Sequence, residues 1–275
     1  MSRYKKAFDA LKKKKEGAIM PFAVIGDPDY ETSLKIVKIL AEKGDMLELG
    51  IPFSDPIADG PTIQRADARA LKNGFDTDRI FDFIREVRKF TDKPIGLLVY
   101  YNLMYQYGVD RFCNKAKESG ADSILAADLS LEESNDFIEA AGKNKIDTIF
   151  LVTQLTNTER LKKILERAKG FVYIVNVLGV TGARADLGKA TLELIKRVRV
   201  HTKLSLCAGF GISKPEHVKA VLKAGADGAI VGSAIVKIIE ENQNDKERML
   251  KEIEEYLGVM KGGVLKNKRI KLNNF

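Results

Sequence analysis

Residues 47–64 read LELGIPFSDPIADGPTIQ, and this stretch predicts a buried strand that leads through a stiff loop into a helix. Glu48 stands between two leucines, where a charge is poorly placed unless one face of the strand lines a polar pocket. Three prolines and two glycines then turn the chain sharply. The loop carries two further carboxylates, Asp55 and Asp59, so chemistry is expected at this strand–loop–helix junction.

The same unit of strand and helix recurs along the chain. Each apolar run of strand length is followed by a segment with helical spacing, and the runs do not alternate cleanly with polar residues. Burial on both faces, and hence a parallel sheet, is the natural interpretation. Eight such units predict an α/β fold of the (β/α)8 TIM-barrel class, with residues 1–275 forming a single domain. The predicted strands are 18–25, 46–51, 95–100, 123–127, 148–152, 172–177, 204–207 and 228–231.

Two helices are expected beyond the eight-fold repeat. One precedes the first strand, at about residues 4–15, and the other is inserted over residues 76–90, between the second and third strands. Ser/Thr-x-x-Glu patterns at 130–133, 156–159 and 213–216 also predict capping boxes at the starts of three helices.

Composition narrows the class of protein. The chain has 275 residues and 45% hydrophobic content, and no apolar run approaches the roughly eighteen residues of a membrane span. The N-terminus has no apolar signal-peptide core. Its two cysteines, Cys113 and Cys207, show no metal-ligand spacing, so a reduced cytoplasmic protein is expected.

The net charge of +8 is open to two interpretations. Basic runs at 12–15 and 266–269 make nucleic acid one conceivable partner. No nucleic-acid-binding motif accompanies them, which favours a solvated surface with mild attraction for an anionic small substrate. Neither a nucleic-acid nor a membrane partner is therefore expected.

A phosphate site is predicted at the carboxyl ends of the last two strands, where barrel enzymes bind their substrates. Gly209-Phe210-Gly211 follows the seventh strand, and Gly232-Ser233 opens the helix after the eighth. Backbone N–H groups of such loops and helix starts can hold a phosphate without a basic side chain. The alternative is that these are ordinary turn glycines. The glycine-rich loop 179–188 after the sixth strand is either a mobile lid or a plain surface loop.

Three carboxylates are candidates for acid–base chemistry. Apolar neighbours inside a barrel would raise the pKa of Glu48, so that it exchanges protons near neutrality. The alternatives are an internal ion pair for Glu48 and ordinary turn chemistry for Asp55 and Asp59. Metal binding by the three carboxylates is a further possibility, but no second ligand cluster supports it.

An apolar pocket above the phosphate site is the last element of the candidate site. Seven residues on strands or at their ends can wall it, although each can equally be a core residue. A substrate with a phosphate at one end and a flat hydrophobic group at the other would suit the combination. These residues are Phe22, Leu98, Tyr100, Leu125, Ala127, Leu151 and Tyr173.

Residues 47–64 closely resemble the signature of the tryptophan synthase α subunit family, which has the form LELGxPFSDPxADGPTIQ. Five further segments are similar to that family in order and spacing, so that the resemblance covers nearly the whole chain. They are 21–28, 96–102, 179–182, 209–213 and 232–236.

The resemblance implies a carbon–carbon lyase that cleaves indole-3-glycerol phosphate to indole and glyceraldehyde 3-phosphate in tryptophan biosynthesis. By position in the motifs, Glu48 would protonate the indole carbon that bears the glycerol chain, Asp59 would hold the indole N–H, and Tyr173 would lie beside the reacting side chain. The remaining roles would be phosphate binding by Gly182, Gly211, Gly232 and Ser233, indole packing by Phe22, Leu98, Tyr100, Leu125, Ala127 and Leu151, and closure of a lid by Thr181.

The resemblance also implies a partner. Asp55 would face a tryptophan synthase β subunit in an α2β2 heterotetramer, and that β subunit would hold pyridoxal phosphate, whereas this chain would need neither cofactor nor metal. Val24, Ser130 and the segment 153–155 depart from the family pattern, in the pocket and on the partner surface. Two other functions remain open at this point: another phosphate-binding barrel, such as a sugar-phosphate isomerase or epimerase, and a binding subunit that has lost turnover.

Overall fold

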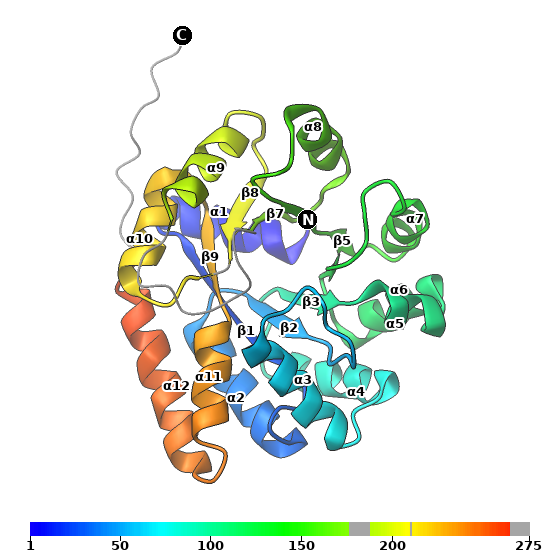
Figure 1. Cartoon of the computed structure of the whole chain (residues 1–275), viewed down its shortest axis with the longest axis vertical. Helices are drawn as coiled ribbons and strands as arrows, with labels where there is room; N and C mark the ends of the chain where they lie inside the picture. The colour runs from blue at the N-terminus through cyan, green and yellow to red at the C-terminus, as the bar shows by residue number, and fades with distance from the viewer. Residues whose placement is uncertain (176–187, 210, 265–275) are drawn as a thin grey trace.

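The chain forms a closed parallel barrel surrounded by helices (Figure 1). The computed structural model describes residues 1–175, 188–209 and 211–264. All the strand pairs are parallel, in the order β5-β4-β3-β2-β1-β9-β8-β7-β6. The strands are β1 (Ala18–Val24), β2 (Leu47–Gly50), β3 (Ile95–Val99), β4 (Ser123–Ala126), β5 (Asp147–Thr148), β6 (Phe150–Val152), β7 (Phe171–Ile174), β8 (Ser205–Ala208) and β9 (Gly228–Val231).

The prediction of an eight-fold barrel is confirmed. Strands β5 and β6 are separated by Ile149 alone and together make the fifth predicted strand, 148–152. The order of strands therefore begins and ends on the same stretch of chain, which closes the sheet on itself. The strand faces are buried almost throughout, as expected for parallel strands covered by helices.

Helices occupy the connections between strands. The predicted N-terminal helix is α1, and the predicted extra helix at 76–90 is α4, which follows α3 between β2 and β3. Second helices also follow β3 and β9, and these were not predicted. The helices are α1 (Arg3–Lys14), α2 (Tyr30–Lys43), α3 (Pro61–Lys72), α4 (Thr77–Arg88), α5 (Tyr101–Tyr107), α6 (Val109–Ser119), α7 (Asn135–Lys143), α8 (Thr158–Arg167), α9 (Lys189–Arg199), α10 (Pro215–Ala224), α11 (Ser233–Glu241) and α12 (Lys246–Lys261).

Helix α1 closes the amino-terminal end of the barrel. Its Tyr4 is fully buried, and the Tyr4 hydroxyl lies 3.0 Å from Ser123 Oγ at the start of β4. Gly96 of β3 makes room for this ring, because a Cβ there would lie 2.6 Å from Tyr4 Oη. Tyr4 and Phe8 belong to the same buried cluster as Tyr173 of β7, so α1 forms the floor beneath the barrel interior.

The predicted capping boxes are wrong as helix starts. Ser130 and Glu133 do bond to each other, at 2.8 Å between Oγ and Oε2, but α7 begins after both of them. Asn157 caps α8 in place of Thr156. The Thr156 hydroxyl instead accepts the N–H of Thr153 within the preceding loop, at 3.0 Å. A short polar side chain can serve a loop as readily as a helix start, which is why the pattern misled by a residue or more.

Within the described residues, no helix combines the length and the apolar character that crossing a membrane requires.

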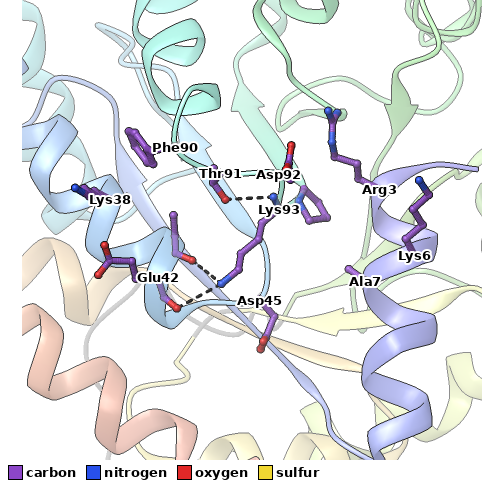
Figure 2. Close-up of a pocket in the computed structure, with 12 residues that line it drawn as sticks. Arg3, Lys6, Ala7, Lys38, Glu42, Asp45, Phe90, Thr91, Asp92 and Lys93 are labelled. Atoms are coloured by element: carbon purple, nitrogen blue, oxygen red, sulfur yellow. Dashed lines mark hydrogen bonds between the residues drawn. The ribbon is translucent and has the colours of Figure 1, made fainter.

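A surface hollow of about 580 Å³ lies between α1, α2 and the loop before β3 (Figure 2). Its central side chain, Lys93, donates from Nζ to the carbonyl oxygens of Ala41 and Gly44, both at 2.6 Å. Lys93 therefore serves the last carbonyls of α2, which have no partner within the helix. This hollow adjoins the beginnings of the strands, at the end of the barrel opposite the candidate site.

Candidate active site

Glu48 of β2 lies in the barrel interior, with 4% of its surface exposed. The Tyr173 hydroxyl of β7 points at it from across the barrel and donates to Glu48 Oε2 over 3.4 Å. Phe22 of β1 is its register partner on the neighbouring strand. No ion pair to Glu48 is found in the described part of the chain, so the interpretation of Glu48 as one half of an internal ion pair finds no support there.

The pKa of Glu48 is raised to about 8: burial is the largest cause, the bond from Tyr173 opposes the rise, and the negative charge of Asp59 adds to it. The prediction that apolar neighbours make this carboxyl exchange protons near neutrality is consistent with that environment. A carboxyl that is protonated at pH 7 can act as a general acid.

Asp59 is held in the loop between β2 and α3. Tyr100, which follows β3, donates its hydroxyl hydrogen to Asp59 Oδ2 at 2.7 Å, and the same hydroxyl accepts the Ala58 N–H at 3.0 Å. The Phe53 ring stacks on the Tyr100 ring, with centroids 4.9 Å apart. Burial raises the pKa of Asp59, and the Tyr100 bond opposes the rise. These contacts fix the Asp59 side chain, which an ordinary turn aspartate would not require.

Asp55, four residues earlier in the same loop, is exposed and does not face the barrel. The adjacent Ser54 hydroxyl donates to Asp55 Oδ2 at 2.5 Å. The loop thus separates its two carboxylates: Asp59 faces inward and Asp55 faces outward.

The predicted apolar wall comes together in large part. Leu98, Leu125 and Leu151 pack in the interior cluster that contains Tyr173, and Leu98 also joins Phe22 in a neighbouring cluster. Ala127, just beyond β4, is half-buried. Tyr100 has a polar role as well, through the hydroxyl that binds Asp59.

A smaller hollow of about 240 Å³ lies near this wall. Leu125 and Leu151 line it together with Ser130, Thr153 and Arg160, whereas neither Glu48 nor Asp59 does. Two of the departures from the family pattern thus lie beside the apolar wall. The third, Val24, is buried next to Phe22.

The described phosphate candidates lie on one rim. Strands β8 and β9 are neighbours, so Gly211, Gly232 and Ser233 all follow adjacent strand ends. Gly211 has φ +77°, and Gly232 precedes α11, whose first residue is the exposed Ser233. A Cβ on Gly232 would lie 3.1 Å from Phe22 Cδ1. This places the α11 N-terminus against the apolar wall, a favourable position for an anion. Gly182 and Thr181 lie outside the described residues.

Two residues of α3 contact the Asp59 loop and were not predicted from the sequence. Gln64 donates from Nε2 to the Asp59 carbonyl oxygen at 2.8 Å. Asp67, with 4% of its surface exposed, accepts the backbone N–H of Phe53. A signal for Asp67 was present, because it lies among Ala66 and Ala70 on the buried face of an amphipathic helix.

In the described residues, no three His, Cys, Asp or Glu side chains are grouped as a metal site.

The family model for the tryptophan synthase alpha chain matches residues 8–265. A tryptophan synthase alpha chain from Methanothermobacter thermautotrophicus is 54% identical over 245 residues, which are 89% of this chain and 91% of the relative. One from Photobacterium profundum is 44% identical over 263 residues, 95% of this chain and 98% of the relative.

Solved structures agree. A structure of the tryptophan synthase complex from Pyrococcus furiosus matches with a TM-score of 0.84 and 40% identity, covering 90% of this chain and 98% of that chain. A chain from the α2β2 complex of the same organism matches with a TM-score of 0.85 and 42% identity, with the same coverage. The barrel, the length and the family signature all coincide, and this chain belongs to the tryptophan synthase alpha chain family, whose members are enzymes of tryptophan synthesis.

Proposed function

We propose that this chain is a carbon–carbon lyase that cleaves indole-3-glycerol phosphate to indole and glyceraldehyde 3-phosphate by a retro-aldol reaction. The observation that carries the proposal is a carboxyl with a pKa of about 8 inside an apolar barrel, Glu48, facing Tyr173 with Asp59 near enough to raise that pKa. Membership of the tryptophan synthase alpha chain family supports it.

The reaction requires a proton donor and a hydrogen-bond acceptor on different edges of one flat substrate. Protonated Glu48 gives its proton to the indole carbon that bears the glycerol chain, while the Asp59 carboxylate binds the ring N–H and stabilises the positive charge that develops. The carbon–carbon bond then breaks, and its electron pair restores the aromatic ring. The side-chain hydroxyl becomes the aldehyde as its proton returns to the Glu48 carboxylate, and Tyr173 lies beside this group.

Substrate binding uses the two ends of the site. We assign the phosphate to Gly211, Gly232 and Ser233 at the start of α11, together with Gly182, and the closing lid to Thr181. The indole would pack on Phe22, Leu98, Tyr100, Leu125, Ala127 and Leu151. The N–H groups at a helix N-terminus bind a phosphate dianion, and an apolar wall packs against a planar ring.

A β subunit is the proposed partner, with Asp55 on the interface. The Pyrococcus furiosus relative forms an α2β2 complex. Three large apolar residues of this chain, Ile57, Tyr105 and Leu155, are 84%, 66% and 84% exposed. All three follow strand ends on the same rim as Asp55, and exposed apolar side chains grouped on one face are typical of protein interfaces. Pyridoxal phosphate would belong to the β subunit, and we propose no cofactor for this chain.

We also propose that residues 1–275 form one domain in a reducing cytoplasm. One contiguous cluster joins the strands to the surrounding helices, and both cysteines are buried and unpaired.

The test is an assay of the full-length chain with indole-3-glycerol phosphate, with and without a tryptophan synthase β subunit. We expect equal amounts of indole and glyceraldehyde 3-phosphate, with faster release when the β subunit is added. Conversion to a phosphorylated isomer without indole would support the isomerase alternative. Binding without any product would support the non-enzymatic alternative.

A further inference from the structure

Helix α3 contacts the loop that carries Asp59 at both ends of that loop. Gln64, in the first turn of α3, donates from Nε2 to the carbonyl oxygens of Asp59 at 2.8 Å and Pro56 at 3.4 Å. One turn later, the Asp67 carboxyl accepts the N–H of Phe53. Residues three apart on a helix share a face, so a single surface of α3 meets both ends of residues 53–59.

Tyr100 connects Phe53 to Asp59. The Phe53 ring stacks on the Tyr100 ring at 4.9 Å, and the Tyr100 hydroxyl binds both the Ala58 N–H at 3.0 Å and Asp59 Oδ2 at 2.7 Å. An unbroken series of contacts thus joins Asp67 to the carboxylate of Asp59.

Asp67 is paired with no cation among the residues that the structure describes. The charged groups that face it are Asp59, from the loop, and Asp27, from the segment after β1. Asp27 already binds Arg69 through two hydrogen bonds, at 2.7 and 2.9 Å. The pKa of Asp67 is raised to about 8, mainly by burial and also by the charges of Asp59 and Asp27, and the Phe53 bond opposes the rise. Asp67 is therefore neutral at pH 7, which allows a second carboxyl to lie near Asp59 without repelling its charge.

We propose that Asp67 and Gln64 are positioning residues for Asp59, which hold the loop 53–59 so that the Asp59 carboxylate faces the substrate. The expected effect on catalysis rests on the proposed function. The structural part of the inference, that α3 immobilises this loop, is independent of the proposed function. Both side chains contact the loop that carries Asp59, so their effect is on the geometry of the reacting groups, where a displacement of about 1 Å costs roughly 100-fold in rate.

Four variants of the full-length chain test the proposal by kcat and KM for indole release. Asp67→Asn keeps an oxygen that accepts the Phe53 N–H, and we expect kcat within about threefold of the unmodified chain. Asp67→Leu removes the acceptor and Gln64→Ala removes the donor, and we expect kcat to fall by roughly 10- to 100-fold in each, with a smaller change in KM. Equal losses in Asp67→Asn and Asp67→Leu would overturn the proposal.

The fourth variant, Asp122→Leu, is the control for the loss of a buried carboxyl group. Asp122 is 6% exposed and accepts the Ile95 N–H at 3.0 Å, but unlike Asp67 it is also paired with Arg3 and Arg88, and it lies at the opposite end of the barrel. We expect it to lower Tm without lowering kcat per folded molecule. If Asp67→Leu behaves in the same way, Asp67 has only a structural role and the proposal fails. If Asp67→Leu does not fold, an unchanged kcat in the exposed-site variant Gln64→Ala overturns the proposal.

Amide hydrogen exchange separates this inference from the proposed function, because it needs no turnover. Peptides covering residues 53–60 should exchange faster in Asp67→Leu and in Gln64→Ala than in Asp67→Asn or Asp122→Leu. Unchanged exchange in both variants would overturn the positioning role even if the unmodified chain releases indole. Faster exchange in a chain that releases none would leave the positioning role standing and overturn the lyase assignment.

Discussion

Tyr100 donates its hydroxyl hydrogen to Asp59 Oδ2 across 2.7 Å. The two residues come from neighbouring strand ends, Asp59 from the loop after β2 and Tyr100 from the end of β3. The bond is what separates Asp59 from a turn aspartate, since it fixes the side chain and favours the charged carboxylate. A carboxylate that must bind a ring N–H needs both properties.

Replacing Tyr100 with Phe should therefore weaken catalysis without unfolding the barrel. The pKa of Asp59 is already raised by burial, and loss of the hydroxyl removes the one group that opposes the rise. We expect the acid limb of the pH profile of kcat/KM to move to higher pH, and kcat/KM at pH 7 to fall by about tenfold. Tyr105→Phe, on the exposed face of α5, should leave the profile in place. An unmoved acid limb in Tyr100→Phe would contradict the role of this bond.

The pKa of Glu48 predicts where activity ends. As the proton donor it must be protonated, so indole release should decline as pH rises through about 8. A profile of kcat/KM against pH measures this directly. If activity continues unchanged to pH 10, Glu48 does not act as the acid.

The raised pKa of Glu48 also makes the stability of the fold depend on pH. The pKa of Glu48 rises from 4.5, the value for an unperturbed Glu, to about 8 in the folded chain, so the folded state binds more protons than the unfolded state between these values. Stability contributed by protonated Glu48 is therefore present below pH 4.5 and is lost as pH rises to about 8. Urea unfolding should show Glu48→Gln to be more stable than the unmodified chain at pH 9, by a few kcal/mol, with a difference that shrinks towards pH 5. A difference that does not vary with pH would argue against a buried, protonated Glu48.

Arg69 and Arg65 lie one turn apart on α3, and we expect them to contribute very differently to the stability of the fold. Asp27, whose side chain is fully buried, binds Arg69 through two bonds. Burial still raises its pKa, because the cost of burying the charge exceeds what Arg69 returns. Arg69→Ala should cost about 3–5 kcal/mol at pH 7 in urea unfolding, and less at lower pH, where Asp27 takes up a proton. Arg65 is 53% exposed and paired with Glu240, and its substitution by Ala should lower the free energy of unfolding far less, because water and salt screen an exposed pair. If both variants lose the same free energy of unfolding, the burial of Asp27 does not determine how much its ion pair contributes to stability.

The packing of α1 on β3 can be tested with two substitutions, made singly and together. A Cβ at position 96 would lie 2.6 Å from Tyr4 Oη and 2.9 Å from Ser123 Oγ. Gly96→Ala should therefore destabilise the chain by about 1–3 kcal/mol. Adding Tyr4→Phe removes one of the two clashing atoms, so the double variant should lose less than the sum of the two single variants. Additive losses in Tm or urea midpoint would mean that α1 does not pack on β3 in this way.

The sequence alone predicted the barrel that the structure shows, and it singled out Glu48 and Asp59 as candidate site residues. Strand-length apolar runs with helices between them specify a parallel barrel almost without reference to tertiary detail, because both faces of each strand must be covered. Glu48 stood out since a charge on such a strand has few structural explanations. The positions of the helix starts were harder to predict from the sequence. Thr156 fits a cap, but its hydroxyl bonds inside the loop, a choice that only the folded backbone determines.

Contacts between segments far apart in the sequence were also beyond prediction. Tyr100 was assigned to an apolar wall, and its hydroxyl bond to Asp59 depends on the pairing of two strand ends. Asp67 carried a usable signal, a carboxylate on a buried helix face, but its partner Phe53 lies fourteen residues earlier and meets it only once the loop has folded back on α3.

The central claim is that Glu48 and Asp59 act together in cleaving a carbon–carbon bond. The most direct measurement is indole release from indole-3-glycerol phosphate by the purified chain, compared with Glu48→Gln and Asp59→Asn. We predict measurable release by the unmodified chain and a loss of at least about 100-fold in each variant, with all three proteins folded. No release by the unmodified chain with a β subunit present, or undiminished release by either variant, would contradict the account.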